Sequence, residues 1–234
     1  MLTLPATTTA LVLVDLQQGI VPMPTLAPRP GTEVAATCIR LAEKFRAARA
    51  PVVLVNVAFA SDFGDALKQP VDRPMAHPEG GFPANFSHLI EGIYQPGDIL
   101  VTKHQWGAFY GTDLDAQLRR RGVRTVVLGG IATNIGVEST ARQAHEHAYD
   151  VVIAEDATTS LSGERRRLRC HYRGIDQGRH LLCHGDAKRS LPADPAGWTG
   201  ALQVRRRTCG WRCWPDAKTF AGFRSTSGAP RSGE

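Results

Sequence analysis

The chain has 234 residues, a formal net charge of +6 and 42% hydrophobic residues, so it is long enough for one domain with a sizeable core and an appendage. It contains no apolar run of about 18 residues, and its N-terminal stretch lacks the basic flank and cleavage site of a secretory signal. From these features we expect a soluble cytoplasmic protein rather than a membrane-spanning or secreted one. Five cysteines without a secretory signal also argue against a disulfide framework.

Apolar, β-branched runs predict the strands of the fold, at 9–14, 52–57, 99–102, 125–129 and 151–154. The runs are almost continuously apolar rather than alternating, which is typical of strands buried on both faces of a parallel sheet. Strands that alternate with helical patterns predict an α/β fold, doubly wound, with three α/β/α layers around a mostly parallel sheet. A sixth strand and its covering helix would ordinarily follow, but no pattern for them is legible.

Helix signals lie between these strands. Thr32 is a candidate N-cap for a helix that ends near Arg49, on which Cys38 lies among the apolar positions as a buried structural thiol. Thr112 and Asp115 resemble a capping box, and Gly122 is expected to end that helix. A third helix is expected from about Val137 to Ala148.

Residues 58–97 form an unusually long connection that is rich in Pro, Gly, Asp and His. The sequence indicates a short helix near 86–93 within it. Connections of this length in a compact domain usually cover a site or mediate assembly.

The composition changes after Glu164. Residues 1–164 hold 13 Lys and Arg against 17 Asp and Glu, a net charge of −4, whereas residues 165–234 hold 15 against 5, a net charge of +10. Residues 165–234 have neither helical nor strand periodicity, and we interpret them as an out-of-frame C-terminus from a GC-rich gene, or as a disordered tail. Zinc binding and nucleic-acid binding are alternatives, but the irregular spacing of Cys and His argues against a zinc module.

Polar residues follow three of the predicted strands at their carboxyl ends. Asp15 follows the first strand, Lys103 follows the third, and the glycine-containing turn 130–136 follows the fourth. Ligands of open α/β sheets bind beyond these strand ends. An Asp and a Lys in one crevice would keep each other charged, which predicts a lowered pKa for Asp15 and a raised pKa for Lys103. A purely structural ion pair is the alternative.

Several motifs in order resemble the isochorismatase-like (cysteine hydrolase) superfamily. They lie at 13–19, 96–103, 106–114, 129–142 and 155–157. The resemblance covers about residues 5–164, so we expect residues 1–164 to be an isochorismatase-like hydrolase domain. It implies a parallel-sheet α/β hydrolase that acts on a small molecule, forms a homo-oligomer and uses no cofactor.

The resemblance also implies roles for individual residues. Asp15 would be the proton-transfer carboxylate and Lys103 its cationic partner. Ile131 and Ala132 occupy the place of a cis peptide whose neighbouring amides help to form an oxyanion hole. The implied substrate pocket includes Gln17, Trp106, Phe109 and Thr133, although Trp106 and Phe109 are equally compatible with packing of the loop after Lys103.

Gly136 departs from the amidase branch, which has its nucleophilic cysteine there. Without a thiolate at this turn, a covalent thioester route is closed. Isochorismatases proper also lack that cysteine, and they cleave a vinyl ether by protonation and hydrolysis. The residues at 131–134, however, are more similar to those of the amidases. The bond cleaved therefore stays open between a vinyl ether and a C–N bond.

No metal site is expected, because 60–65 lacks the Asp-x-His motif of the metal-binding nicotinamidases. Two other functions remain as alternatives to the hydrolase. One is a catalytically silent member that binds a small carboxylate or acts as an oligomeric scaffold, and the other is nucleic-acid binding through the basic tail.

Overall fold

The computed structural model describes residues 2–70, 72, 78–161, 181–184 and 201–206. The strands are β1 (Leu2–Pro5), β2 (Thr9–Val14), β3 (Val52–Val57), β4 (Ile99–Lys103), β5 (Thr125–Ile131), β6 (Asp150–Thr159), β7 (Leu181–His184) and β8 (Ala201–Arg206). The helices are α1 (Gly31–Ala47), α2 (Leu114–Arg120) and α3 (Glu138–Glu146), with a 3-10 turn η1 (Ala6–Thr8) and a π turn η2 (Thr133–Val137).

The strands form one sheet in the order β1-β8-β7-β6-β5-β2-β3-β4. The five strands expected from the apolar runs are all present and parallel, with β2 between β5 and β3. Their carboxyl ends therefore meet at one edge of the sheet, where the predicted polar residues follow them.

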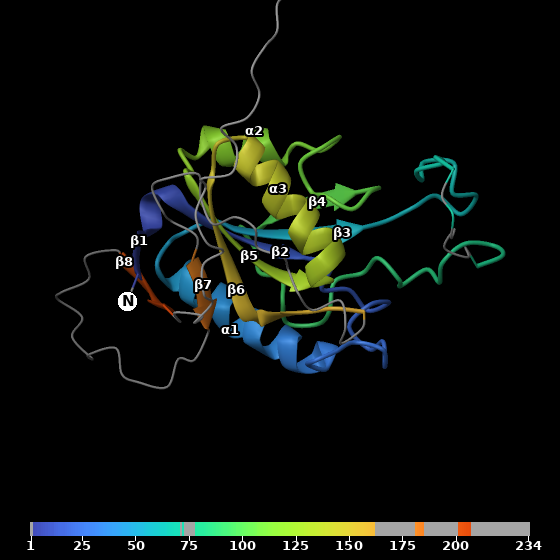
Figure 1. Cartoon of the computed structure of the whole chain (residues 1–234), viewed down its shortest axis with the longest axis horizontal. Coiled ribbons are helices and arrows are strands. Elements are labelled where there is room, and N and C mark those ends of the chain that lie inside the picture. The colour runs from blue at the N-terminus through green and yellow to red at the C-terminus, as the bar shows by residue number, and fades with distance from the viewer. Residues whose placement is uncertain (1, 71, 73–77, 162–180, 185–200, 207–234) are drawn as a thin grey trace, which may run out of the picture.

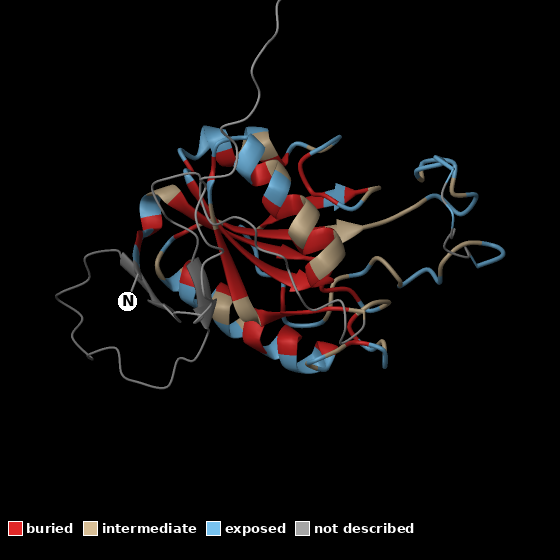
Figure 2. Cartoon of the chain, viewed as in Figure 1, coloured by how far each residue is buried: buried red, intermediate tan, exposed pale blue. Residues whose placement is uncertain are grey.

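The fold has three layers: the sheet lies in the middle, α1 covers one of its faces, and α2 and α3 cover the other (Figure 1). Alternate residues of each strand enter separate cores: Leu13 and Leu54 pack on the α1 side, whereas Val12 and Val53 pack on the α2 and α3 side. Figure 2 shows this as buried strands between helices whose outer faces are exposed. Burial on both faces explains the continuous apolar runs. Cys38 lies in the α1-side core as predicted, and its burial raises the pKa of the thiol.

The predicted helix starts need correction. Helix α1 begins at Gly31 after Pro30 and has no side-chain cap, so Thr32 is its second residue rather than its N-cap. Helix α2 begins at Leu114, whose N–H donates to Thr112 Oγ1 at 3.2 Å, so the threonine half of the proposed capping box is present. The Asp115 half is absent, because its carboxylate binds the Arg119 and Tyr149 side chains instead. Gly122 does end this region, with a φ of +67° that favours glycine.

The structure contains a sixth parallel strand that the sequence did not reveal. Strand β7 pairs with β6, and β8 runs antiparallel to both β7 and β1. Strand β7 has four residues and β8 has six, and neither shows an alternating or continuous apolar pattern beyond a few residues, which is why no periodicity identified them. The rest of 165–234 lies outside the described residues, so the out-of-frame hypothesis stays a prediction.

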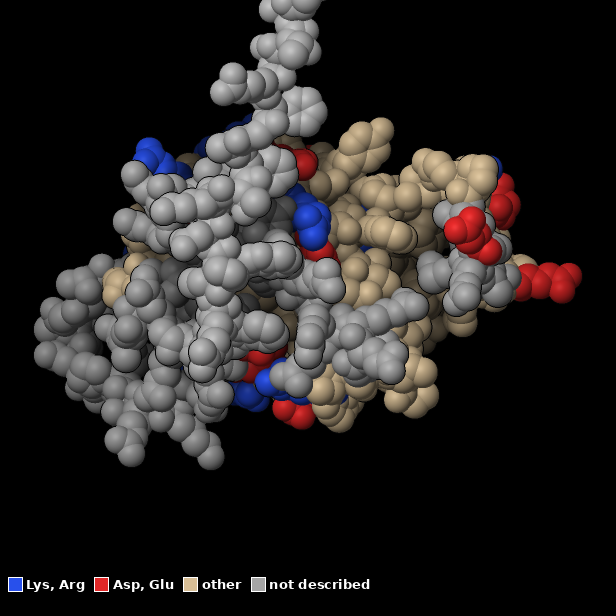
Figure 3. Space-filling view, viewed as in Figure 1, with Lys and Arg blue, Asp and Glu red and all other residues tan. Residues whose placement is uncertain are grey.

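Between β3 and β4, the described residues of 58–98 leave the sheet as a long arm (Figure 1). Its described residues form turns and bends, so the helix expected near 86–93 is absent. Phenylalanines at 59, 63, 82 and 86 contact one another along the arm, and acidic side chains lie at its far end (Figure 3). Within the described residues, no helix has the length and apolar character needed to cross a membrane.

Candidate active site

Asp15 lies at the point where the chain leaves β2. Its N–H donates to the Val55 carbonyl at 2.8 Å, which continues the hydrogen bonding between β2 and β3. Its φ of +55° is left-handed, a conformation that Asp tolerates better than most residues. This turn of the backbone places a buried carboxyl group at the carboxyl edge of the sheet.

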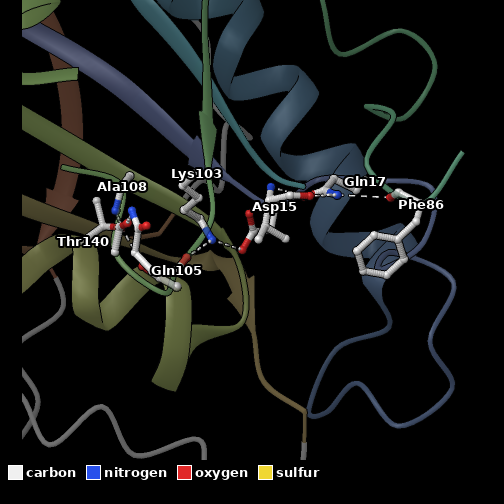
Figure 4. A network of polar contacts seen from close by, with 10 residues as sticks. Asp15, Gln17, Phe86, Lys103, Gln105, Ala108 and Thr140 are labelled. Carbon is white, nitrogen blue, oxygen red and sulfur yellow. Dashed lines mark hydrogen bonds and ion pairs between the residues drawn. The ribbon is translucent and has the colours of Figure 1, made fainter. Parts of the chain in front are cut away.

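Lys103, the last residue of β4, reaches Asp15 from two strands away (Figure 4). Its Nζ lies 2.9 Å from Asp15 Oδ2 and also donates to the Gln105 carbonyl at 3.1 Å. The side chains of Lys103 and Asp15 are only 2% and 8% exposed. The two predicted strand-end residues therefore form a buried ion pair.

The pKa of Asp15 is raised to about 6, mainly because burial disfavours the charged carboxylate, while Lys103 lowers it by a smaller amount. The predicted lowering of this pKa was wrong, because desolvation outweighs the attraction of the ammonium. Asp15 Oδ1 is buried and has no hydrogen-bond partner among the described residues. The carboxyl group thus combines one anchored oxygen with one unpaired oxygen.

The turn after β5 faces this carboxyl group. The peptide bond between Ile131 and Ala132 is cis, as the family resemblance implied, and the π turn Thr133–Val137 follows it. The Ala132 carbonyl accepts hydrogen bonds from Ile135 and Val137. In general, the first amides of a helical turn have no carbonyl partner within the turn itself.

Gly136 lies within this turn and directly against the ion pair. A Cβ atom at this position would lie 3.0 Å from Asp15 Oδ2 and 3.0 Å from Val14 Cγ1. Gly136, which the family resemblance places at the cysteine position of the amidase branch, therefore lies close to the Asp15 carboxyl group.

Gly130 explains how the turn approaches so closely. Its φ is +115°, and a Cβ there would lie 2.0 Å from the Val14 carbonyl oxygen. Only glycine fits both the conformation and the space. Gly130 pairs with Val14 in the sheet, so it sets the separation between the turn and the residue that precedes Asp15.

The four predicted pocket residues lie in different environments. Thr133 is buried and begins the π turn that contains Gly136. Gln17 is fully buried, and its carboxamide bonds the N–H and carbonyl of Val57 and the carbonyl of Phe86, so it fastens the arm 58–98 to the sheet. Its polar atoms are engaged with backbone rather than turned toward a substrate.

The two predicted aromatic pocket residues, Trp106 and Phe109, differ in exposure. Trp106 is 60% exposed on the loop after Lys103, whereas Phe109 is 5% exposed and stacks on His147 with ring centroids 5.1 Å apart. Phe109 therefore packs beneath α3, which is the loop-packing alternative left open by the sequence. Trp106 stays at the surface of the loop that carries Gln105.

Sequence reasoning missed the polar residues that hold the loops in place. Thr140 on α3 bonds both the Gly136 carbonyl and the Ala108 N–H, and Ser160 after β6 donates to the side chain of Asn134. Hydroxyl groups on the inner side of helices and strands give no sequence signal of their own. In the described part of the chain, no three His, Cys, Asp or Glu residues lie together in a group that could hold a metal ion.

Comparison with known proteins gives a consistent result. The Isochorismatase domain family model matches residues 9–173. The chain is 52% identical over 166 residues to the isochorismatase family protein YecD of Escherichia coli O157:H7, covering 70% of this chain and 87% of that protein. It is 34% identical over 185 residues to the ureidoacrylate amidohydrolase RutB of Variovorax paradoxus, covering 69% and 73%.

Solved structures agree with these matches. An isochorismatase family protein from Burkholderia thailandensis superposes with a TM-score of 0.67 at 44% identity, covering 75% of this chain and 92% of that one. The N-carbamoylsarcosine amidase from Thermoplasma acidophilum superposes with a TM-score of 0.59 at 27% identity, covering 76% and 97%. The chain therefore belongs to the isochorismatase family of α/β hydrolases.

Proposed function

We propose that this protein hydrolyses a small molecule without a covalent cysteine intermediate, with Asp15 as the proton-transfer group. One observation carries the proposal: Asp15, in its buried pair with Lys103, lies 3.0 Å from where a Cβ of residue 136 would be, and its Oδ1 has no hydrogen-bond partner among the described residues. An unpaired buried carboxyl oxygen is costly unless a ligand or a proton satisfies it.

The surrounding donors suit a substrate oxygen. An ammonium group has three N–H donors, and Asp15 and the Gln105 carbonyl take two of those of Lys103. The third donor and the first amides of the turn after Ala132 can bind oxygen that becomes negatively charged during the reaction. Trp106 is available at the surface of the neighbouring loop for a flat part of the substrate.

For a vinyl ether, the chemistry needs acid but no nucleophilic side chain. The protonated Asp15 carboxyl transfers its proton to the terminal vinyl carbon, and the ether oxygen shares the positive charge that forms. Water adds to the adjacent carbon and returns a proton to Asp15. The resulting hemiketal then breaks its C–O bond to give a carbonyl compound and an alcohol.

For a C–N bond, Asp15 would act in its ionised form. The carboxylate takes a proton from water as the water oxygen attacks the carbonyl carbon, and the turn amides stabilise the oxyanion. Asp15 then delivers that proton to the departing nitrogen as the C–N bond breaks. The names of two relatives, a ureidoacrylate amidohydrolase and an N-carbamoylsarcosine amidase, support testing this class.

The pH dependence of kcat/KM distinguishes the two routes, because it reports ionisations of the free enzyme. The pKa of Asp15 is about 6. If the acid form is required, kcat/KM falls about tenfold per pH unit above that value. If the carboxylate is required, kcat/KM rises with pH and levels off above it.

The experiment is a turnover screen of the full chain on isochorismate, small amides and N-carbamoyl compounds. Asp15→Asn should lower turnover by about 10²–10⁴-fold. Asp98→Asn is the matched control, since Asp98 is also buried in an ion pair, with Arg46 at 2.6 Å, but lies at the other end of β4. Equal activity of the two variants would refute the proposal.

Gly136→Cys supplies the missing thiol as a comparison. A gain of amidase activity in this variant would show that the remaining site is intact. Absence of turnover by every variant, together with a thermal shift on adding small carboxylates, would favour the silent binding protein instead.

A further inference from the structure

The loop after Lys103 rests on two polar side chains of α3. Ala108 N–H donates to Thr140 Oγ1 at 3.1 Å, and Phe109 N–H donates to Gln143 Oε1 at 3.1 Å. Residues three apart on a helix lie on the same face, so Thr140 and Gln143 together receive two consecutive backbone amides. We call these two side chains the loop cradle.

Contact between the cradle and the loop is very close. A Cβ at Gly107 would lie 2.2 Å from Gln143 Oε1. The loop backbone can therefore lie against the Gln143 carboxamide only because residue 107 has no side chain. Gln105 further stiffens the loop, since its Nε2 donates to the Gly107 carbonyl at 3.2 Å.

Thr140 joins this loop to the opposite wall of the site. Its hydroxyl donates to the Gly136 carbonyl at 2.6 Å while accepting from Ala108, and the side chain is fully buried. At the other end of the loop, the Gln105 carbonyl holds Lys103 Nζ (Figure 4). One hydroxyl thus links the turn with the loop that anchors the ammonium.

A threonine that bonds the carbonyl four residues earlier is common in helices and needs no functional reason. Thr37 on α1 does the same, donating to the Glu33 carbonyl at 3.0 Å, and the only other hydrogen bond of its side chain among the described residues comes from Arg40 on the same helix. Thr140 differs because it also receives an amide 32 residues away. That second bond is the one that a purely helical role does not require.

We infer that Thr140 and Gln143 are positioning residues, which fix the loop 105–109 against the Gly136 turn so that Lys103 stays on Asp15. This inference rests on the proposed function for its catalytic consequence, but its geometric part can be tested without a substrate. If the cradle is lost, the loop can move away with the Gln105 carbonyl, and Lys103 loses one of its two anchors.

The test compares Thr140→Val, which keeps the shape but removes the hydroxyl, with Thr140→Ser, which keeps the hydroxyl. Thr37→Val is the matched control for loss of a helical hydroxyl bond. In the full chain, Thr140→Val should speed amide hydrogen exchange at Ala108 by at least about tenfold. Since Lys103 lowers the pKa of Asp15, weaker anchoring should also raise this pKa, measured by NMR titration of the Asp15 carboxyl carbon.

With any substrate found in the screen, Thr140→Val should lower kcat/KM by about 10²-fold, mostly through kcat, because a displaced catalytic group costs rate more than binding. Thr140→Ser should keep the exchange rate of Ala108, the pKa of Asp15 and kcat/KM close to their wild-type values. Thr37→Val should leave all three unchanged. The inference is overturned if Thr140→Val only lowers the melting temperature, as Thr37→Val does, with exchange and the Asp15 pKa unchanged. The exchange and titration experiments need no substrate. They can therefore refute the positioning role of Thr140 independently of whether the proposed function is correct.

Discussion

Replacing Lys103 with Met should destabilise the protein in a pH-dependent way. The substitution keeps a long side chain but removes the charge and both hydrogen bonds, to Asp15 and to the Gln105 carbonyl. Asp15 is then a buried carboxyl group without its cation. Because Lys103 lowers the pKa of Asp15, its removal raises this pKa further above 6.

The magnitude follows from proton linkage. In the wild type, the pKa of Asp15 is 3.8 when unfolded and about 6 when folded, so stability decreases as pH rises between these values and is flat above them. In the variant, the folded carboxyl stays protonated above pH 6 while the unfolded one is ionised. Each further pH unit then costs about 1.4 kcal/mol, or about 2–3 kcal/mol by pH 8. This loss lies at or just below the lower end of the usual cost of breaking a buried pair, about 3–5 kcal/mol.

The assay is urea unfolding followed by circular dichroism at pH 6 and pH 8, with the free energy of unfolding compared between wild type and variant. Lys44→Met, at an exposed lysine of α1, is the control, and its effect on the free energy of unfolding should be the same at both pH values. If the loss of stability in Lys103→Met is the same at both pH values, the Asp15 carboxyl does not depend on Lys103 and the reasoning fails.

Two further substitutions test the supports of the site. Gly130→Ala places a Cβ 2.0 Å from the Val14 carbonyl oxygen at a φ of +115°, so we expect a loss of more than about 4 kcal/mol, measured by thermal unfolding, and a stable variant would contradict this packing. Gln17→Leu removes two hydrogen bonds to the Val57 backbone, so it should cost about 2–4 kcal/mol and speed proteolysis within the arm 58–98, and unchanged cleavage there would disprove the fastening role.

The sheet was predictable because burial on both faces leaves a direct trace in sequence. Strands 9–14 and 52–57 match β2 and β3 to the residue. The meeting of Asp15 and Lys103 was predictable for a related reason, since parallel strands bring their carboxyl ends to one edge. Such inferences need only the order of residues along the chain and the direction of the strands.

Other features depend on contacts that sequence order does not contain. The sequence left Phe109 equally compatible with the pocket and with loop packing. Its contact with His147, 38 residues later in the chain, depends on how the loop after Lys103 meets the end of α3. The direction of the Asp15 pKa shift depends on how completely water is removed, which outweighed the charge of Lys103. Thr140 was overlooked because a buried hydroxyl has no periodic signature.

The ion pair itself gives a reason to favour catalysis over a silent scaffold. Burying two charges costs several kcal/mol per ion, and replacing such a pair by uncharged groups is often neutral or stabilising. The double variant Asp15→Asn/Lys103→Met should therefore be as stable as wild type within about 1 kcal/mol at pH 8, while each single variant is less stable. Asn is chosen at position 15 because it tolerates the φ of +55°. If the double variant instead loses as much stability as the two single variants combined, the pair has a structural purpose and its burial no longer argues for proton transfer.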